Sequence, residues 1–262
     1  MTTKYGPNLI YNGIVDVYEA NTGVGVNSLS PSAGSPGTWE VNNFAEVVGP
    51  AGFKYIQSNT NSTGQGTSHI NSPINTNLYT GSITFLLWMN LNNVPLDVSL
   101  NNNWRGLICT AGGGSAGSPL TCVLEQSYVL NYSTTHTDRY RRYINGNFAP
   151  VNVPADGWNM YTYTYDQATG IATAYRNETL IITGPQTESG TGSNPTTPGL
   201  PLSYGNYSSS GFRVFGGTQN DGALGGNGPC PGFLGSVYIY NRAISGDENA
   251  LMFNNLKGRY GV

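Results

Sequence analysis

The segment Ser82–Leu91 constrains the fold more than any other stretch of the chain. In an extended strand, alternate side chains point to opposite faces. One face would carry Ile83, Phe85, Leu87, Met89 and Leu91. Leu86 and Trp88 would occupy the other face, so both faces are apolar. A strand of this kind is typical of the centre of a sheet that is at least partly covered on both sides.

The rest of the chain consists of short strand-like segments separated by polar loops. The 262 residues include 36 Gly and 15 Pro, and only 10% are charged. Many short strands at regular spacing favour an all-β, two-sheet antiparallel jelly-roll sandwich. We find no internal repeat and no linker, and therefore expect residues 1–262 to form one domain.

The one helix that the sequence predicts lies close to the C-terminus. Ser245 is followed three residues later by Glu248, which is a capping box and marks a helix start. Gly258 is placed to end the helix in the left-handed conformation. The expected fold is therefore all-β with one short C-terminal helix.

The strand before this helix, Phe233–Tyr240, is rich in apolar and aromatic residues. We expect it to pair beside the first strand near Ile14 and to close the sheet. Phe253 and Leu256 lie on one face of the following helix by their spacing. They are expected to cover one end of the core.

The three cysteines, Cys109, Cys122 and Cys230, are an odd number. Cys109 and Cys122 flank a Gly-rich loop and could face each other across a hairpin. A disulfide between them and two small buried thiols are alternatives that the sequence leaves open.

The segments that flank Asn145-Gly146 read as a hairpin of Arg139–Ile144 with Phe148–Val153. Its first strand overlaps the most basic cluster of the chain, which contains Arg139, Tyr140, Arg141, Arg142 and Tyr143. Tyr and Arg anchor protein interfaces, and Tyr rings also stack on sugars, so these residues are candidates for carbohydrate or partner binding. The alternative is an edge or outer-face strand whose charges prevent aggregation.

Trp104 and Arg105 are a second candidate pair for carbohydrate or partner binding, because they follow an Asn-rich loop. Trp39, Trp88 and Trp158 are instead expected in the core.

The order of five segments resembles a known family. These segments are Gly13–Asn21, Ser82–Leu91, Trp158–Tyr175, Arg213–Gly217 and Phe233–Ser245. Together they look like the laminin-G-like, concanavalin A-like lectin/glucanase jelly roll, with Glu19 where an Asp is more usual. The ending Phe253–Gly261 looks most like copies of this domain in structural proteins of tailed marine bacteriophages. The resemblance implies a lectin-like fold on a virus particle.

The sequence lacks a catalytic pattern. The resemblance implies that glucanase members of this family carry a Glu-x-Asp-x-x-Glu run on one strand, which supplies the two carboxylates of retaining hydrolysis. No such run occurs in this sequence. Glu125 is the only acid inside a plausible central strand. His69 and His136 are isolated, so neither a metal triad nor a Ser–His–Asp set is indicated. We therefore expect no enzymatic activity and no catalytic residues.

No cofactor is expected, although the fold could hold a calcium ion in its loops. Asp221 is the best candidate ligand. The alternative is a turn Asp that caps its own backbone.

Charge and hydropathy bear on partners and location. The net charge of −3 and the lack of a long apolar run predict no nucleic-acid and no membrane partner. Residues 1–7 show no signal-peptide core, which is typical of a protein assembled in the host cytoplasm.

Three functions follow. The leading hypothesis is a non-enzymatic virion structural protein, in capsid decoration or in the tail or fibre, with a glycan-binding or host-adhesion role. Its partners would be other virion proteins, cell-surface glycans and further copies of itself on the particle. The alternative is a free carbohydrate-binding lectin, and the least favoured is a glycoside hydrolase that uses Glu125.

Overall fold

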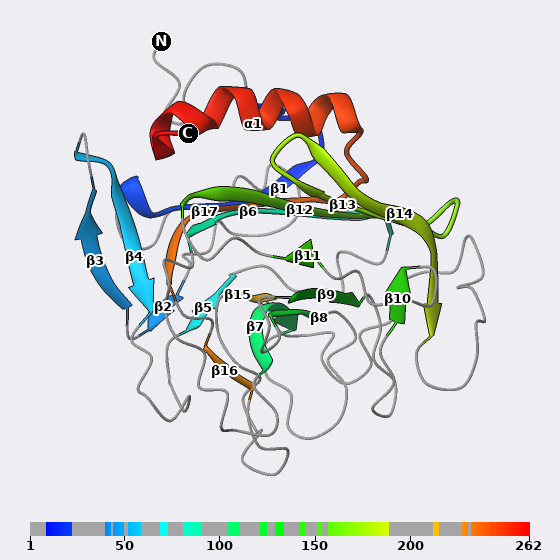
Figure 1. The fold of residues 1–262 in the computed structure, drawn as a ribbon, viewed down its shortest axis with the longest axis horizontal. Coiled ribbons are helices and arrows are strands. Elements are labelled where there is room, and N and C mark those ends of the chain that lie inside the picture. Colours follow the sequence, from blue (N-terminus) through cyan, green and yellow to red (C-terminus); the bar gives the residue numbers. More distant parts are fainter. Residues whose placement is uncertain are drawn as a thin grey trace.

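Two stacked sheets and one α-helix make up the computed structural model of the protein (Figure 1). The structure describes residues 9–22, 40–42, 44–49, 52–58, 69–72, 81–90, 104–110, 121–124, 129–133, 142–144, 151–152, 157–188, 212–214, 227–229 and 232–262. The helix α1 (Gly246–Tyr260) lies across the outer face of the larger sheet, and the second sheet covers its inner face. The predicted all-β sandwich with one C-terminal helix is confirmed.

The large sheet has nine strands among the described residues. Eight of them follow the order β10 (Arg142–Ile144), β14 (Thr179–Glu188), β13 (Ile171–Arg176), β12 (Asn159–Asp166), β6 (Ile83–Asn90), β17 (Phe233–Tyr240), β4 (Lys54–Ser58), β3 (Phe44–Val48). The ninth, β1 (Ile14–Glu19), pairs with β17, and a short 3-10 turn η1 (Ala20–Thr22) follows it.

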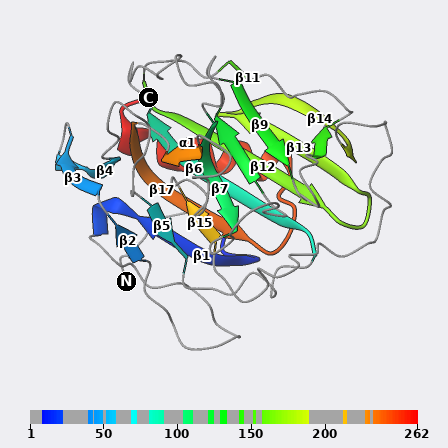
Figure 2. The same cartoon turned by 90° about the horizontal axis from the view of Figure 1, so that it is seen from below.

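The second sheet has eight strands among the described residues. Its order is β11 (Val151–Asn152), β9 (Val129–Ser133), β8 (Thr121–Leu124), β7 (Trp104–Thr110), β15 (Phe212–Val214), β5 (His69–Asn71), β2 (Glu40–Asn42). β16 (Asn227–Pro229) pairs in parallel with β7. Figure 2 shows these strands in front of the large sheet, seen from below.

β6 is central, as its two apolar faces predict. It pairs with β12 on one side and with β17 on the other, and seven of its eight residues are buried. Trp88 and Leu86 are 0% exposed and belong to the core cluster under α1. Both faces of this strand are mostly apolar because a layer of protein covers each of them.

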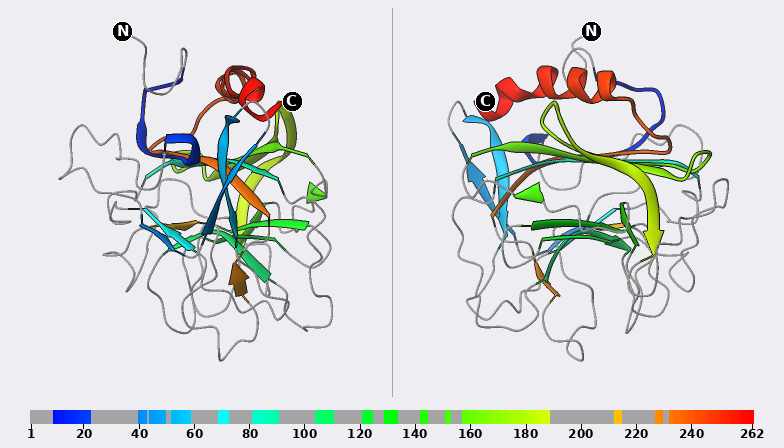
Figure 3. Two further views of the ribbon diagram at one scale, coloured as in Figure 1. Left: turned by 90° about the vertical axis from the view of Figure 1, so that its left-hand side faces the viewer. Right: turned by 45° about the vertical axis from the view of Figure 1, so that its right-hand side comes forward.

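The strand β17 pairs with β1 as expected, with Ile14 opposite Tyr240. The expectation that this pairing closes the sheet is wrong. β1 occupies only the part of the β17 edge from Ser236 onward, and β4 pairs with Phe233 and Leu234 on the same edge. The large sheet therefore continues through β4 to β3 and remains open (Figure 3).

The capping box at the start of α1 is confirmed. Ser245 accepts a hydrogen bond from the Glu248 amide, and the Glu248 side chain accepts one from the Ser245 amide. The predicted end at Gly258 is wrong, because the helix continues to Tyr260 and Gly261 adopts the left-handed conformation with φ 73°. Tyr260 is buried against Trp88, and this packing retains the last turn of the helix.

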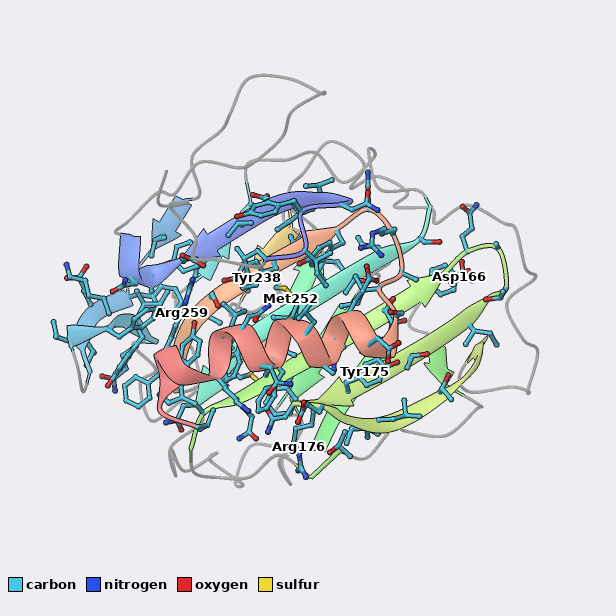
Figure 4. All side chains as sticks on the ribbon, turned by 90° about the horizontal axis from the view of Figure 1, so that it is seen from above. Asp166, Tyr175, Arg176, Tyr238, Met252 and Arg259 are labelled. Carbon is cyan, nitrogen blue, oxygen red and sulfur yellow. The ribbon has the colours of Figure 1, made fainter. Side chains whose placement is uncertain are left out.

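The position of α1 also differs from the expectation. Phe253 and Leu256 do not cover one end of the core but lie on the outer face of the large sheet, in one cluster with Trp88 and Tyr238. Figure 4 looks down on this face and labels Met252 of α1 and Tyr238 of β17. The apolar outer face of β6 and β17 requires a cover, and α1 provides it.

The described parts of the predicted hairpin around Asn145-Gly146, residues 142–144 and 151–152, do not pair with each other. β10 pairs with Gln186–Glu188 at the end of β14, and β11 pairs with β9. The two segments thus belong to different sheets. β14 bends toward the second sheet where β10 joins it (Figure 1).

Candidate functional site

The candidate residues of the sequence fall on two different sheets. Trp104 and Arg105 begin β7 and pair with β16 in the second sheet. Arg142 and Tyr143 lie in β10, which is the last strand on one side of the large sheet. Arg139, Tyr140 and Arg141 lie outside the described residues. Among the described strands, β10 thus has the edge position of a strand whose charges prevent aggregation. The role of Trp104, Arg105 and the basic cluster in binding stays a prediction.

The cysteines, acids and histidines of the sequence analysis are only partly placed. Cys122 pairs with Ile108 and Cys109 pairs with Thr121, so the two cysteines are not register partners. Asp221, Glu125, His136 and Cys230 lie outside the described residues. Within the described ranges, no three His, Cys, Asp or Glu residues are grouped to hold a metal ion, and no helix is long and apolar enough to span a membrane.

A buried polar network fastens the C-terminal end of α1 to the sheet. Glu19 accepts hydrogen bonds from the Tyr238 hydroxyl at 2.5 Å and from Arg259 Nη1 at 2.8 Å. The hydroxyls of Ser236 and Tyr260 lie 2.8 Å apart. Burial, and then the negative charge of Glu19, raise the pKa of Tyr238. These groups satisfy one another under the helix, and we assign them a structural role.

A second set of contacts holds the first turn of α1. Asn177 stands in the turn between β13 and β14 with φ 56°, a conformation that Asn tolerates better than most residues. The backbone N–H of Asn177 donates a hydrogen bond to Met160 O at 2.7 Å, and its side-chain Oδ1 accepts one from Met160 N at 2.8 Å. Its carbonyl accepts a 2.7 Å hydrogen bond from the fully buried Asn249 of α1. Sheet and helix are thus joined by one turn residue.

An aromatic patch lies on the outer face of the large sheet, at the C-terminal end of α1. We define it as Phe53, Tyr55, Trp158 and Phe233, all of which are partly exposed. The Tyr55 ring lies 5.2 Å from Trp158 and 5.1 Å from Phe233, in edge-to-face geometry in both cases. Phe53 and Trp158 also contact the buried Tyr260, at 5.5 and 4.8 Å.

Three parts of the large sheet build the patch, and Phe53 directly precedes β4. Tyr55 comes from β4, Phe233 opens β17, and Trp158 directly precedes β12. Gly49 leaves room for Tyr55, because a Cβ at this position would meet the Tyr55 ring at 2.4 Å. Strand backbones and ring contacts thus fix the aromatic side chains in place.

Partly exposed aromatic rings on a sheet can bind apolar or flat surfaces, including the faces of sugars. The sequence analysis did not find this patch. It expected Trp158 in the core, and Trp158 does pack against the core cluster while part of the residue remains exposed. Phe53 and Tyr55 are close in sequence, but Trp158 and Phe233 lie in two other segments far along the chain, so no single local pattern marks all four residues. The alternation of Phe53 and Tyr55 with Lys54 was the only local signal.

The same fold occurs in carbohydrate-active proteins. A family model described as the concanavalin A-like lectin/glucanases superfamily matches residues 63–248, which is more than half of the chain. The chain belongs to the concanavalin A-like lectin/glucanase superfamily. This bears out the family resemblance of the sequence, and the comparisons leave the bacteriophage part of it a prediction.

Two kinds of solved structure share the superfamily fold with this chain. Domain 4 of AbnA, a GH43 extracellular arabinanase from Geobacillus stearothermophilus, in complex with arabinotriose, has a TM-score of 0.55 and 15% identity, over 90% of this chain and 96% of that domain. A mutant of Trypanosoma rangeli sialidase displaying trans-sialidase activity has a TM-score of 0.59 and 12% identity over 98% of this chain.

Other structures of Trypanosoma rangeli sialidase are similar to the same degree, including a complex with the inhibitor DANA at a TM-score of 0.57 and 12% identity, over 95% of this chain. The chain covers 35% of the mutant and 34% of the DANA complex, or about a third of each sialidase chain. No curated protein sequence resembles it significantly. At identities of 12–15%, these structures show a shared fold and nothing about the function of this chain.

Proposed function

We propose that this chain is a non-enzymatic glycan-binding domain and a structural component of a virus particle, in capsid decoration or in the tail or fibre. The observation that carries the glycan-binding part is the fold match with domain 4 of AbnA, which spans nearly all of both chains and was solved with arabinotriose. This likeness of fold to a domain in complex with a sugar supports a glycan-binding role for this chain.

The virion part rests on the resemblance of residues 253–261 to bacteriophage structural proteins. In this role the domain would be held by other virion proteins and by further copies of itself, and its glycan-binding surface would face the host cell.

A glycan array and a hydrolysis assay with the same purified protein test the first part. We expect binding to at least one neutral glycan and no release of reducing sugar from any bound one. Turnover that Glu125→Gln abolishes would instead establish a glycoside hydrolase.

Mass spectrometry of purified particles tests the second part. We expect the chain in stoichiometric amounts in the particle fraction. A chain that binds glycans but never occurs in particles would be a free lectin, which is the alternative function.

A further inference from the structure

We infer that the aromatic patch of Phe53, Tyr55, Trp158 and Phe233 is a binding site for a neutral sugar, and this inference rests on the proposed glycan-binding function. The patch occupies outer sheet surface that α1 leaves uncovered, beyond the helix end at Tyr260. Each of its rings packs on another ring while part of its surface remains exposed.

The dimensions of the patch fit a short oligosaccharide. Tyr55 contacts both Trp158 and Phe233, at centroid distances of 5.2 and 5.1 Å. The rings of Trp158 and Phe233 are therefore at most about 10 Å apart. This is the length of roughly two sugar rings, because one sugar ring is about as long as the spacing between two neighbouring strands. A longer chain would extend past the patch along the sheet.

The chemistry of the patch selects an uncharged ligand. Its four rings carry no charge, and Gln57 follows Tyr55 by two residues on the same strand and hence on the same face. Gln57 supplies amide groups that can hydrogen-bond sugar hydroxyls. Lys54 precedes Tyr55 on β4 and Glu46 of β3 lies opposite Ile56, so both are on the other face, where they pair with each other at 2.7 Å. A neutral sugar matches this surface better than an acidic one such as sialic acid.

The site is also preorganised, which lowers the entropic cost of binding. Tyr260 of α1 is 8% exposed, and its ring contacts the rings of Phe53 and Trp158. Gly49 allows Tyr55 to lie over the turn before β4, where a larger residue would displace the ring.

Titration of the full chain with arabinotriose and cellobiose, against sialyllactose as the charged comparator, tests the inference. We expect Trp158→Ala and Tyr55→Ala to weaken binding of the neutral sugars at least about tenfold, as the loss of one aromatic contact implies. Tyr11→Ala is the matched control, because Tyr11 is an exposed tyrosine outside the patch.

Trp158→Phe keeps the test independent of any folding defect in the alanine variants. Sugar binding at the patch should change tryptophan fluorescence in the wild type, and Trp158→Phe should lose this change while it still binds sugar. Neutral-sugar binding that is equal in the wild type and in folded Trp158→Ala, or a fluorescence change that persists in Trp158→Phe, overturns the inference and leaves the proposed function standing. Tighter binding of sialyllactose overturns the selection for neutral sugars. No binding of any sugar by the wild type overturns both the inference and the proposed function.

Discussion

Arg259 and Glu19 form an ion pair between residues 240 positions apart, with Arg259 Nη1 2.8 Å from Glu19 Oε1. The Glu19 side chain is only 5% exposed, whereas that of Arg259 is 22% exposed. The pair fastens the last turn of α1 to the first strand. The family resemblance would place an Asp at this position, and the longer Glu19 is the side chain that contacts Arg259 here.

Arg259→Ala should lower the free energy of unfolding by about 3 kcal/mol, because it leaves the Glu19 carboxylate buried without its cation. We expect the loss near the lower end of the usual range since Arg259 keeps contact with water. Urea unfolding measures the change. The double variant Glu19→Gln/Arg259→Met is the control and should lose less than Arg259→Ala, and an equal or greater loss would contradict the role of uncompensated charge.

Acidic pH should weaken the start of α1 through Glu248. Hydrogen bonds from Arg242, whose two terminal nitrogens lie 2.8 and 2.6 Å from the carboxylate, hold the pKa of Glu248 below its usual 4.5. A carboxyl group with a lowered folded-state pKa stabilises the protein above its unfolded pKa, and the stabilisation is lost as the pH falls through the folded pKa.

Thermal unfolding of the wild type and of Glu248→Gln over a range of pH checks this. The wild type should be more stable than Glu248→Gln at neutral pH, and the difference should shrink below about pH 4.5 and disappear as the pH falls through the lowered folded-state pKa. A difference that does not change with pH would show that the charge of Glu248 is not responsible.

Alkaline pH should destabilise the protein through its buried tyrosines. Burial raises the pKa of Tyr238, Tyr240 and Tyr260 above the usual 10.0. A group whose folded-state pKa is raised contributes stability that is complete below its unfolded pKa and is lost as the pH rises toward the folded value. Stability should therefore fall above about pH 10.

The ultraviolet absorbance of tyrosinate, recorded together with circular dichroism, measures this effect. We expect part of the absorbance to appear only when the β-sheet signal is lost. Full ionisation of all tyrosines in a protein that keeps its native circular dichroism would contradict the prediction.

Gly235→Ala should destabilise the fold, because the new Cβ would meet the Tyr260 ring at 2.3 Å. Neither the core strand β17 nor the buried ring can move freely, so we expect a loss of about 1–3 kcal/mol, as for other overpacked cores. Thermal unfolding measures the loss.

Gly258→Ala is the matched control for Gly235→Ala. A Cβ at Gly258 would meet nothing within 4 Å, and the residue lies inside α1. This variant should stabilise the protein by about 0.5–1 kcal/mol, because Ala is the better helix former. Destabilisation by Gly258→Ala would mean that the helix ends at Gly258 in solution.

Local chemistry explains which features of this fold could be predicted from the sequence. The capping box of Ser245 and Glu248 needs only four consecutive residues, and it is present as expected. The central position of β6 follows from the alternation of its own side chains. Local patterns did not predict which strands pair when the true partner is distant in sequence. Asn145-Gly146 predicted a hairpin, but β10 pairs with β14 instead.

The candidate site shows the same limit. Trp158 alone reads as a core residue, and only its partial exposure and its contact with Tyr55 place it in a surface patch beside the buried Tyr260. Tyr55 is in β4, Trp158 directly precedes β12 and Tyr260 ends α1. These residues come together only when the sheet has formed and α1 packs on its outer face.

The sequence by itself determined the strands, the start of the helix and the superfamily, because alternation, capping and segment order are properties of neighbouring residues. The tertiary structure alone decided where α1 lies, where it ends and which edge of β17 each strand occupies. The physical reason is that burial of Trp88 and Tyr260 and the pairing of Glu19 with Arg259 depend on residues far apart in the chain. Their energies outweigh the local preference for a helix stop at Gly258.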